Sequence, residues 1–325
     1  MKVALNGFGR IGRLVFRILE EDDNFEVVAI NNMSDTKQTA YLLKYDSIHG
    51  SYKKDSISYD EENIIIDGKK VRVFSEKDPV NLPWGELGVD LVLECSGKFN
   101  SLEYASRHVV AGAKRVLVSA PCKGDVKTIV YGVNENLLDG TEKVISAASC
   151  TTNCLAPVLK VLNDNFGIEK GFMTTIHAYT NDQNLVDGSH KKEIEERRGR
   201  GAAFNIVPTS TGAAKAIGKV IPEVDGKFEG SAIRVPTADG SLIDLTLVLK
   251  QDVDIGTINK TFEENKSEVI EATYDPIVSS DVIGSTYGAI VDLSLTSTCD
   301  GLVKIVAWYD NEYGYSKQMV RVAKY

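Results

Sequence analysis

The chain has 325 residues, of which 43% are hydrophobic and 26% are charged, and its formal net charge is −9. This length predicts about two domains, because a single hydrophobic core rarely grows beyond ~250–300 residues. The negative charge disfavours nucleic acid as a partner, since a phosphate polymer would be repelled. No apolar run reaches the ~18 residues that span a bilayer, so we expect no membrane partner either.

Short apolar runs alternate with helical patterns through the first half of the chain. Ile11–Glu21, for example, places its apolar residues on one helical face. Alternation of strand and helix predicts a parallel, doubly wound sheet. Ser56–Phe74 differs, because short β-rich pieces surround Asp67-Gly68, and we expect an antiparallel insertion there. The runs expected to be strands of the parallel sheet are Val3–Leu5, Val27–Ile30, Asp90–Cys95, Arg115–Val118 and Val144–Ala147.

The pattern changes after Cys150. A helix is expected over Cys154–Phe166, followed by longer strands with few helices between them, which predicts an antiparallel sheet in an α+β domain. Asn181–Ala203 shows no clear period, and a loop of that length is usually functional or disordered. Asn311–Tyr325 is predicted to be a terminal helix. The expected strands are Gly171–Ala178, Glu229–Pro236, Leu242–Leu249, Ala289–Ser294 and Val303–Tyr309.

These patterns predict an α/β, Rossmann-type doubly wound parallel sheet domain and an α+β catalytic domain with an antiparallel sheet. Residues 1–149 are expected to form the first domain and residues 150–310 the second, with the long loop 181–203. Residues 311–325 are expected to form a C-terminal helix that packs back on the first domain.

A glycine-rich turn follows the first predicted strand and opens the first predicted helix. Its G-x-G-x-x-G pattern is formed by Gly7, Gly9 and Gly12. In a dinucleotide fold the first glycine permits the tight turn, the second lets the backbone approach a pyrophosphate, and the third allows close helix–strand packing. The helix N-terminus adds the positive end of its dipole. We therefore predict dinucleotide binding at this turn.

The second predicted strand ends about 20 residues beyond the glycine turn, where NAD enzymes usually carry an acidic residue for the adenosine ribose. This chain has Asn32 at that place. A carboxylate would repel a ribose 2′-phosphate, whereas an amide can donate a hydrogen bond to it. A second interpretation is that Asn32 binds a plain ribose more weakly.

Cys150 is predicted to lie at the start of a helix, within the run Ser149–Cys154. A helix N-terminus favours the thiolate and lowers the pKa of a cysteine. His177 ends a predicted strand of the same domain, and a Cys–His pair supplies a nucleophile and a base. Cys154, one turn further on, is expected to face the core. The other histidines, expected to be surface or packing residues, are His49, His108 and His190.

The cysteines are scattered and odd in number, which favours a reducing compartment over a disulfide framework. The N-terminus lacks the apolar stretch of a signal peptide and is predicted to be a strand. We therefore expect a cytoplasmic protein. The five cysteines are Cys95, Cys122, Cys150, Cys154 and Cys299.

A dinucleotide fold combined with a thiolate predicts an NAD(P)-dependent aldehyde dehydrogenase. Attack on the aldehyde forms a thiohemiacetal, hydride transfer to the nicotinamide leaves a thioester, and a second nucleophile releases the acid. Backbone N–H groups at the start of the helix can hold the tetrahedral oxyanion. No metal is expected at the site.

The motifs of this chain resemble phosphorylating glyceraldehyde-3-phosphate dehydrogenase essentially from end to end. The run Ser149–Cys154 is the most specific among them. The matching segments are Asn6–Arg13, Leu43–Ser47, Ala148–Pro157, His177–Gln183, Pro208–Lys215 and Trp308–Ser316.

This resemblance implies oxidation of glyceraldehyde 3-phosphate to 1,3-bisphosphoglycerate with reduction of NAD(P), a step of glycolysis and gluconeogenesis. It implies that Cys150 is the nucleophile and that His177 activates it. It also implies a homotetramer in which the Asn181–Ala203 loop lies between neighbouring subunits near the cofactor. The implied cofactor positions are Arg10, Ile11, Asn32, Lys77, Ser119 and Asn311. The positions implied to bind the substrate phosphate and the attacking inorganic phosphate are Ser149, Thr151, Thr180, Arg198, Thr211, Gly212 and Arg234.

Two departures from the family pattern concern the cofactor. Asn32 replaces the ribose-binding aspartate, and Gly188-Ser189 replaces the Leu-Pro pair of strictly NAD-using members. A small residue followed by serine is similar to the photosynthetic, NADP-using branch, and Lys77 can supply positive charge. The expected cofactor is therefore NAD or NADP, with Ser189 a further cofactor-binding residue.

Two other departures concern the catalytic domain. Ala147 stands where an asparagine usually precedes Ala-Ser-Cys, which should alter the support around the thiolate. Glu193–Arg200 is atypical in sequence, which affects the alignment that gives Arg198 its phosphate role.

Three other interpretations stay open. A sister dehydrogenase would act on erythrose 4-phosphate, although Tyr179-Thr180 and the Thr209–Gly212 run favour the triose phosphate. A Cys–His hydrolase or transferase would carry a vestigial nucleotide fold, against which the glycine turn, Ser119 and Asn311 argue. A non-catalytic binding protein on this scaffold would not need the Cys–His pair.

Overall fold

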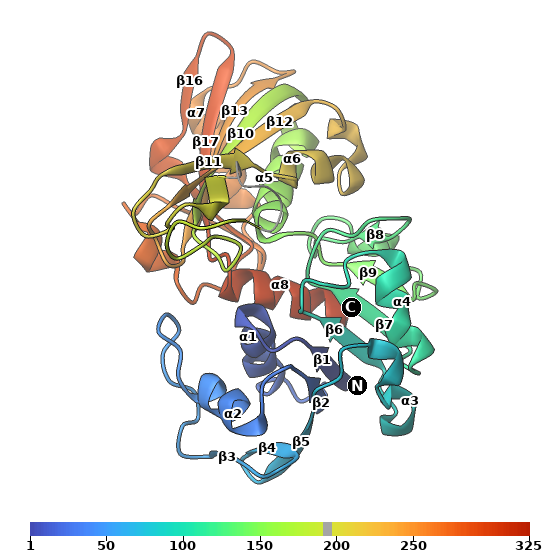
Figure 1. The fold of residues 1–325 in the computed structure, drawn as a ribbon. Coiled ribbons are helices and arrows are strands. Elements are labelled where there is room, and N and C mark those ends of the chain that lie inside the picture. Colours follow the sequence, from blue (N-terminus) through green and yellow to red (C-terminus); the bar gives the residue numbers. More distant parts are fainter. Residues whose placement is uncertain (191–196) are drawn as a thin grey trace. The chain divides into compact units, whose positions relative to one another are not determined.

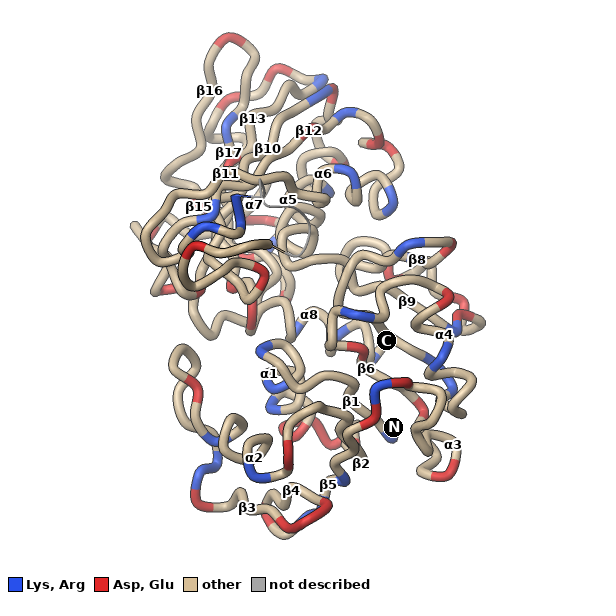
Figure 2. The backbone as a smooth tube through the Cα atoms, viewed as in Figure 1, with Lys and Arg blue, Asp and Glu red and all other residues tan. Residues whose placement is uncertain are grey.

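Two separate β-sheets organise the chain, which the computed structural model describes over residues 1–190 and 197–325 (Figure 1). Each sheet belongs to one of two structural units. Positively and negatively charged residues are interleaved along the backbone of both units (Figure 2). Unit 1 comprises Met1–Tyr131, Glu135–Ser149 and Ser316–Tyr325, and unit 2 comprises Gly132–Asn134 and Cys150–Tyr315.

The sheet of unit 1 has nine strands in the order β3-β4-β5-β2-β1-β6-β7-β9-β8. Every pair from β5 to β8 along this order is parallel, and β5-β2-β1-β6-β7-β9 has the strand order of a doubly wound dinucleotide fold. The insertion pairs antiparallel as predicted, and its last strand also extends the parallel sheet. The strands are β1 Lys2–Asn6, β2 Glu26–Asn31, β3 Ile57–Tyr59, β4 Asn63–Ile66, β5 Lys69–Phe74, β6 Leu91–Glu94, β7 Arg115–Val118, β8 Lys127–Thr128 and β9 Val144–Ser146.

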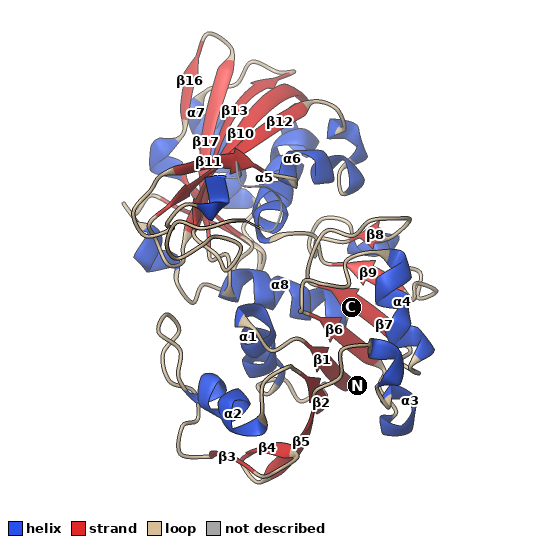
Figure 3. Cartoon of the chain, in the orientation of Figure 1, coloured by secondary structure: helices blue, strands red, loops and turns tan. Residues whose placement is uncertain are grey.

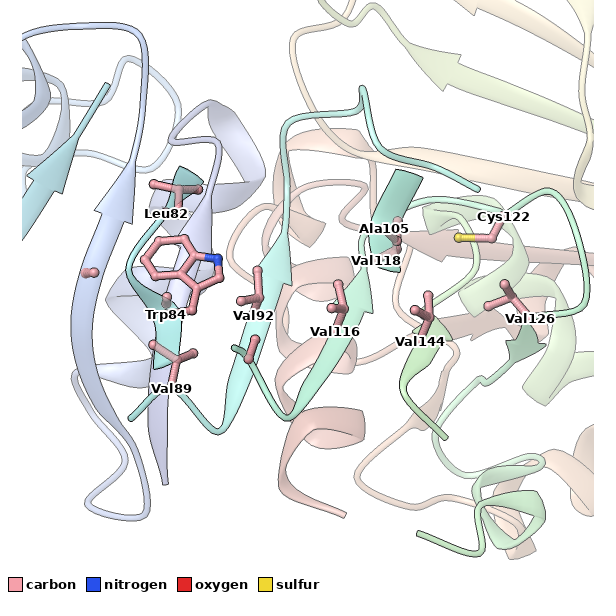
Figure 4. Packing of buried hydrophobic residues seen from close by; sticks show 13 residues of the cluster. Leu82, Trp84, Val89, Val92, Ala105, Val116, Val118, Cys122, Val126 and Val144 are labelled. Atoms are coloured by element: carbon pink, nitrogen blue, oxygen red, sulfur yellow. The ribbon is translucent and has the colours of Figure 1, made fainter. Parts of the chain in front are cut away.

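The central strands of unit 1 are buried along almost their whole length, as apolar parallel strands are when both faces of the sheet are covered. Val92, Val116 and Val144 form one register row across three neighbouring strands and pack in a cluster with Trp84 (Figure 4). The indole N–H of Trp84 donates to Nδ1 of His108 at 3.0 Å. His108 is therefore a packing residue, as the sequence predicts.

The sheet of unit 2 follows the order β11-β12-β10-β13-β17-β15-β14, with β16 paired to β17. Most pairs are antiparallel, as predicted, but β10 pairs parallel with β12, and β14 with β15. Parallel neighbours require a long connection, and the segment between β10 and β12 holds the predicted long loop. The strands are β10 Ile168–Ala178, β11 Val207–Ser210, β12 Phe228–Val235, β13 Ser241–Leu249, β14 Ile270–Thr273, β15 Ala289–Asp292, β16 Ser297–Cys299 and β17 Leu302–Tyr309.

Helices flank the sheet of each unit (Figure 3). Within the described ranges, no helix is long and apolar enough to cross a membrane. The α-helices are α1 Arg10–Leu19, α2 Thr36–Lys44, α3 Trp84–Leu87, α4 Leu102–Val110, α5 Cys150–Phe166, α6 Ala213–Ala216, α7 Ile255–Glu264 and α8 Tyr313–Lys324.

Helix α5 begins at Cys150, so Cys150 lies at a helix start as predicted, although the apolar pattern began the helix four residues later at Cys154. Threonine and asparagine have modest helix propensity, which is why the pattern placed the start too late. Tertiary contact outweighs propensity here, because Oγ1 of Thr151 hydrogen-bonds the hydroxyl of Tyr309 at 2.9 Å. Cys154 is fully buried, as predicted.

The last ten residues, which include most of α8, belong to unit 1. Two contacts fix them there. Nε2 of Gln318 donates to the carbonyl oxygen of Tyr131 at 3.2 Å, and Nζ of Lys324 lies 2.8 Å from a carboxylate oxygen of Asp22.

Candidate functional site

The turn between β1 and α1 contains two glycines that have no room for a side chain. Gly7 has a φ of +93°, and a Cβ on it would lie 2.5 Å from the backbone nitrogen of Ser96. A Cβ on Gly12 would lie 2.2 Å from the carbonyl oxygen of Gly7, so α1 packs directly on the turn. A Cβ on Gly9, by contrast, would meet no atom within 4 Å. A pyrophosphate-binding turn requires such an arrangement, with two glycines that permit the turn and the close packing and one that leaves space for the ligand.

Arg10 opens α1 and is anchored by a carboxylate. Its Nη1 donates to Oδ2 of Asp46 at 2.5 Å, and Oδ1 of Asp46 accepts the backbone N–H groups of Ile48 and His49. Burial raises the pKa of Asp46, but these hydrogen bonds outweigh burial and lower it to about 2. The segment after α2 is thereby tied to the start of α1, where Ile11 is half-buried.

Three further predicted cofactor residues follow parallel strands of unit 1. Asn32 follows β2, Lys77 follows β5, and Ser119 follows β7. Open α/β sheets bind ligands beyond the carboxyl ends of their strands, and these ends meet at one edge. The amide of Asn32 donates to Oγ1 of Thr39 at 3.3 Å, and Lys77 is exposed. The structure thus gathers these residues and the glycine turn at the same edge of the sheet.

In unit 2, Sγ of Cys150 lies 3.4 Å from Nε2 of His177. Cys150 is the first residue of α5, so its sulfur is close to the N–H groups and the positive dipole end of the helix. His177 is 3% exposed and is the second-last residue of β10. The structure therefore brings the two predicted catalytic side chains within hydrogen-bond distance.

Contacts at Nδ1 orient the ring of His177. Its Nδ1 lies 2.7 Å from the carbonyl oxygen of Ala178, which can only accept, and this shorter contact favours the tautomer with the hydrogen on Nδ1. Nη1 of Arg234 donates to the same carbonyl oxygen at 2.9 Å and lies 3.1 Å from Nδ1. Nε2 is left as an acceptor that faces the sulfur of Cys150, and a proton can pass along that line.

Burial strongly affects both groups of this pair. It raises the pKa of the Cys150 thiol, against Arg234 and hydrogen bonds from Thr151, which lower it. Burial, together with the charge of Arg234, lowers the pKa of His177 to about 3. Burial thus opposes the effect of the helix end that the sequence predicts. Both shifts favour the neutral thiol and the neutral imidazole, so the thiolate requires the proton to move from sulfur to Nε2 within the pair.

Tyr309 supports the pair, and the sequence did not point to it. Its hydroxyl lies 2.9 Å from Oγ1 of Thr151 and 2.9 Å from Oγ1 of Thr175, and its ring packs edge-on against His177. The phenol therefore links the first turn of α5 to β10. In the sequence Tyr309 ends an apolar run, and such a run does not predict the hydrogen bonds of a buried hydroxyl.

Two arginines supply positive charge around the pair. Arg234 donates to Oγ1 of Thr180 at 3.3 Å, while its buried Nε–H has no hydrogen-bond partner among the described residues. Arg198 donates to Oγ1 of Thr209 at 3.0 Å and forms an ion pair with Asp182. Arg198 also acts to lower the pKa of His177, which places its charge near the pair. A half-buried guanidinium with an unused donor is suited to an anionic ligand.

The remaining predicted phosphate residues lie on the chain beside these groups. Nη2 of Arg198 donates to the carbonyl oxygen of Ser210, and Thr211 and Gly212 follow directly before α6. Oγ1 of Thr211 accepts the N–H of Ala213 at 3.2 Å. Ser149 precedes Cys150 and is half-buried.

Two predicted cofactor residues lie in unit 2. Asn311 is buried, and its Oδ1 accepts a 2.5 Å hydrogen bond from Ser241, a partner that the sequence did not suggest. Ser189 is exposed, and its carbonyl oxygen accepts from Asn184 at 3.2 Å. Of the atypical run Glu193–Arg200, residues 193–196 lie outside the described residues.

The fold and this site define a protein that combines a dinucleotide-binding unit with a cysteine–histidine pair beside two arginines. Residues 1–102 match the family model described as the glyceraldehyde 3-phosphate dehydrogenase NAD binding domain, and residues 149–311 match that of the C-terminal domain. The chain is 56% identical to a glyceraldehyde-3-phosphate dehydrogenase of Clostridium pasteurianum and 55% identical to one of Clostridium acetobutylicum, in each case over 100% of this chain and 98% of the relative. The chain belongs to the glyceraldehyde 3-phosphate dehydrogenase family and is an oxidoreductase with a nicotinamide cofactor.

Proposed function

We propose that the chain oxidises glyceraldehyde 3-phosphate to 1,3-bisphosphoglycerate, with inorganic phosphate as the second substrate and NAD or NADP as the oxidant. The observation that carries this proposal is the 3.4 Å contact between Cys150 and His177 at the start of α5, close to two arginines. Membership of the family supports the same reaction.

Cys150 and His177 divide the first chemical step between them. As the sulfur attacks the aldehyde carbon, Nε2 of His177 takes the thiol proton, because Nδ1 already carries a hydrogen that the Ala178 carbonyl oxygen holds. The N–H groups of the first turn of α5 can donate to the oxygen on which negative charge develops. Bound NAD(P) supplies the hydride acceptor that converts the thiohemiacetal to a thioester.

The arginines and hydroxyls then hold the phosphate groups. Arg234 with Thr180 forms one set of donors, and Arg198 with Thr209 and the following Thr211-Gly212 forms a second. A guanidinium presents a rigid fork of donors that fits phosphate oxygens. Two sets match the two phosphates of this reaction, one on the substrate and one that attacks the thioester.

Steady-state assays with inorganic phosphate present or absent test the reaction directly. We expect turnover of glyceraldehyde 3-phosphate to depend on phosphate, and Cys150→Ser to abolish it while leaving nucleotide binding unchanged. Preferred turnover of erythrose 4-phosphate would favour the sister dehydrogenase. Failure to bind either nucleotide by calorimetry would favour a hydrolase or transferase, and full activity of Cys150→Ser would contradict the mechanism.

The cofactor proposal is that NADP is accepted alongside NAD. Asn32 carries no charge that would repel a 2′-phosphate, Lys77 is exposed at the same sheet edge, and Ser189 adds a hydroxyl from the long loop. Measuring kcat/KM for both cofactors tests it. We expect Asn32→Asp to raise the preference for NAD by about tenfold, because a carboxylate accepts ribose hydrogen bonds and repels phosphate. Barely detectable NADP turnover by the natural chain would reject this proposal.

We further propose that unit 1 binds the nucleotide, that unit 2 carries the chemistry, and that the protein is a cytoplasmic homotetramer. Four large apolar side chains of the long-loop region are 66–78% exposed, which supports burial against another subunit. They are Leu185, Val186, Phe204 and Ile206. The absence of disulfides among the described cysteines fits a reducing compartment. Sedimentation velocity tests the assembly, and a monomer at micromolar concentration would refute it.

A further inference from the structure

The strand ends of unit 1 are joined by a clamp that the proposed reaction does not use. Nδ2 of Asn31 donates to the carbonyl oxygen of Glu76 at 2.9 Å, and Oδ1 of Asn31 accepts the N–H of Glu76 at 2.8 Å. One side chain therefore satisfies both backbone groups of one residue. The backbone N–H of Asn32 donates to the carbonyl oxygen of Phe74 at 2.9 Å, which closes the same two chain segments.

The clamp fixes two residues that are proposed to meet the cofactor. Asn32 directly follows Asn31, and Lys77 directly follows Glu76. The Glu76 carboxylate also accepts the N–H of Asp78 at 3.0 Å, so the chain is held on both sides of Lys77. The backbone of Lys77 is thus set at a fixed position next to the end of β2.

A buried acid decides which way the amide of Asn31 points. Glu94 is 1% exposed, and its carboxylate accepts hydrogen bonds from Asn6, from the N–H and hydroxyl of Ser96, and from His108. Because Nδ1 of His108 accepts from the indole N–H of Trp84, its Nε2 must carry the hydrogen donated to Glu94.

Glu94 fixes the orientation of the Asn6 amide, which in turn fixes that of the Asn31 amide. A carboxylate can only accept, so Nδ2 of Asn6 faces Glu94 and Oδ1 of Asn6 faces Asn31. Nδ2 of Asn31 must then point to Asn6 at 2.7 Å, which leaves Oδ1 to accept the N–H of Glu76. Each side chain in this network can form its hydrogen bonds in only one orientation, so the network is rigid.

We propose that Asn31 is a positioning residue for cofactor selection: oriented by Glu94 through Asn6, it holds Lys77 beside Asn32 so that the pair can read the 2′ position of the adenosine ribose. This inference rests on the proposed acceptance of NADP. Asn31 acts through Lys77 and makes no contact with the ligand in this account.

Two ligands that carry only the adenosine half test the idea without catalysis. Calorimetry with the full chain gives the affinity ratio of adenosine 2′,5′-bisphosphate to 5′-AMP. We expect Asn31→Ser to lower this ratio at least fivefold and to change 5′-AMP affinity less than twofold. Asn31→Thr, which offers Glu76 the same single hydroxyl on a side chain suited to a strand, should lower the ratio to a similar extent and serves if the serine variant does not fold. Asn24→Ser, in the turn that precedes β2, is the matched control and should leave the ratio unchanged.

A double-mutant cycle shows whether Asn31 works through Lys77. In a Lys77→Gln background, Asn31→Ser should change the ratio less than twofold. Hydrogen exchange at the Glu76 and Lys77 amides should rise in Asn31→Ser alone and not in Lys77→Gln.

Three outcomes would each overturn the positioning role of Asn31. They are an equal loss of affinity for both ligands in Asn31→Ser, an unchanged affinity ratio, and fully additive effects in the double-mutant cycle. The natural chain, measured first, judges the proposed function separately. If the natural chain binds adenosine 2′,5′-bisphosphate and 5′-AMP about equally, the proposed acceptance of NADP is rejected. An affinity ratio in Asn31→Ser that equals the natural one would still count against the positioning role of Asn31.

Discussion

Nη1 of Arg234 lies 3.1 Å from Nδ1 of His177 and shares with it the carbonyl oxygen of Ala178. The arginine thereby does two things at once. It lowers the pKa of His177, second only to burial, and its buried Nε–H has no hydrogen-bond partner among the described residues. In the proposed reaction, base strength and phosphate affinity are therefore coupled through one guanidinium.

Arg234→Gln should therefore change two measured quantities together. We expect KM for glyceraldehyde 3-phosphate or for inorganic phosphate to rise at least about tenfold, because a charge-assisted hydrogen bond contributes ~1.5–3 kcal/mol. Loss of the nearby cation should raise the pKa of His177, so the acid limb of the kcat profile should move to higher pH. Lys304→Gln, which removes a cation from the exposed part of β17, should do neither. A changed KM with an unmoved pH limb would show that the two roles are separate.

The glycines of the β1–α1 turn should respond differently to the same substitution. Gly12→Ala places a methyl group 2.2 Å from the carbonyl oxygen of Gly7, so α1 must shift, and both thermal stability and nucleotide affinity should fall. Gly9→Ala meets no atom within 4 Å, so Tm should stay within about 2 °C while nucleotide affinity falls at least about tenfold. Equal affinity losses without any difference in Tm would mean that Gly12 is not a packing position.

Tyr309→Phe tests the support of the cysteine–histidine pair. Removing the hydroxyl leaves Thr151 without this buried partner, while Thr175 keeps its bond to the Leu242 carbonyl oxygen. We expect a stability loss of about 1–3 kcal/mol and a fall in kcat, with the ring contact to His177 kept. Tyr274→Phe, at an exposed site, is the control. Denaturant unfolding measures the first effect, and an unchanged kcat would limit Tyr309 to a structural role.

Acid should weaken the anchor of Arg10 in a defined window. The pKa of Asp46 is lowered from 3.8 to about 2 in the folded chain, so its contribution is complete above pH 4 and is lost as the pH falls towards 2. Asp46→Asn should cost about 2 kcal/mol at pH 7, and the difference from the natural chain should fall to roughly half at pH 3. Asp23→Asn, an exposed change, should show no such window. A cost that is the same at both pH values would contradict the ion pair.

Much of this architecture is predictable because it is encoded in short, local patterns. The central strands of unit 1 are continuous apolar runs, and the glycine turn lies directly between strand and helix, so β1 and α1 fall close to their predicted bounds. The pairing of Cys150 with His177 was expected from their residue types. Its distance was not, because it depends on how α5 packs against β10. The parallel pairing of β10 with β12 separately brings Arg234 opposite His177.

Other parts of the site depend on contacts that a sequence pattern does not contain. Tyr309 reaches Thr151 across 158 positions, and Ser241 reaches Asn311 across 70. The same holds for the clamp of Asn31, since an asparagine at a strand end is usually only a turn residue. The parallel pairs in the sheet of unit 2 also follow from long connections rather than from alternation.

The central claim is that His177 takes the proton of Cys150, and alkylation of Cys150 measures this most directly. The rate of carbamidomethylation by iodoacetamide is followed from pH 5 to 10 in the natural chain and in His177→Asn, with His49→Asn as control. With the base removed, burial keeps the thiol protonated to higher pH, so the rate at pH 7 should fall at least about tenfold and the profile should move to alkaline pH. Superimposable profiles for the natural chain and His177→Asn would contradict the account.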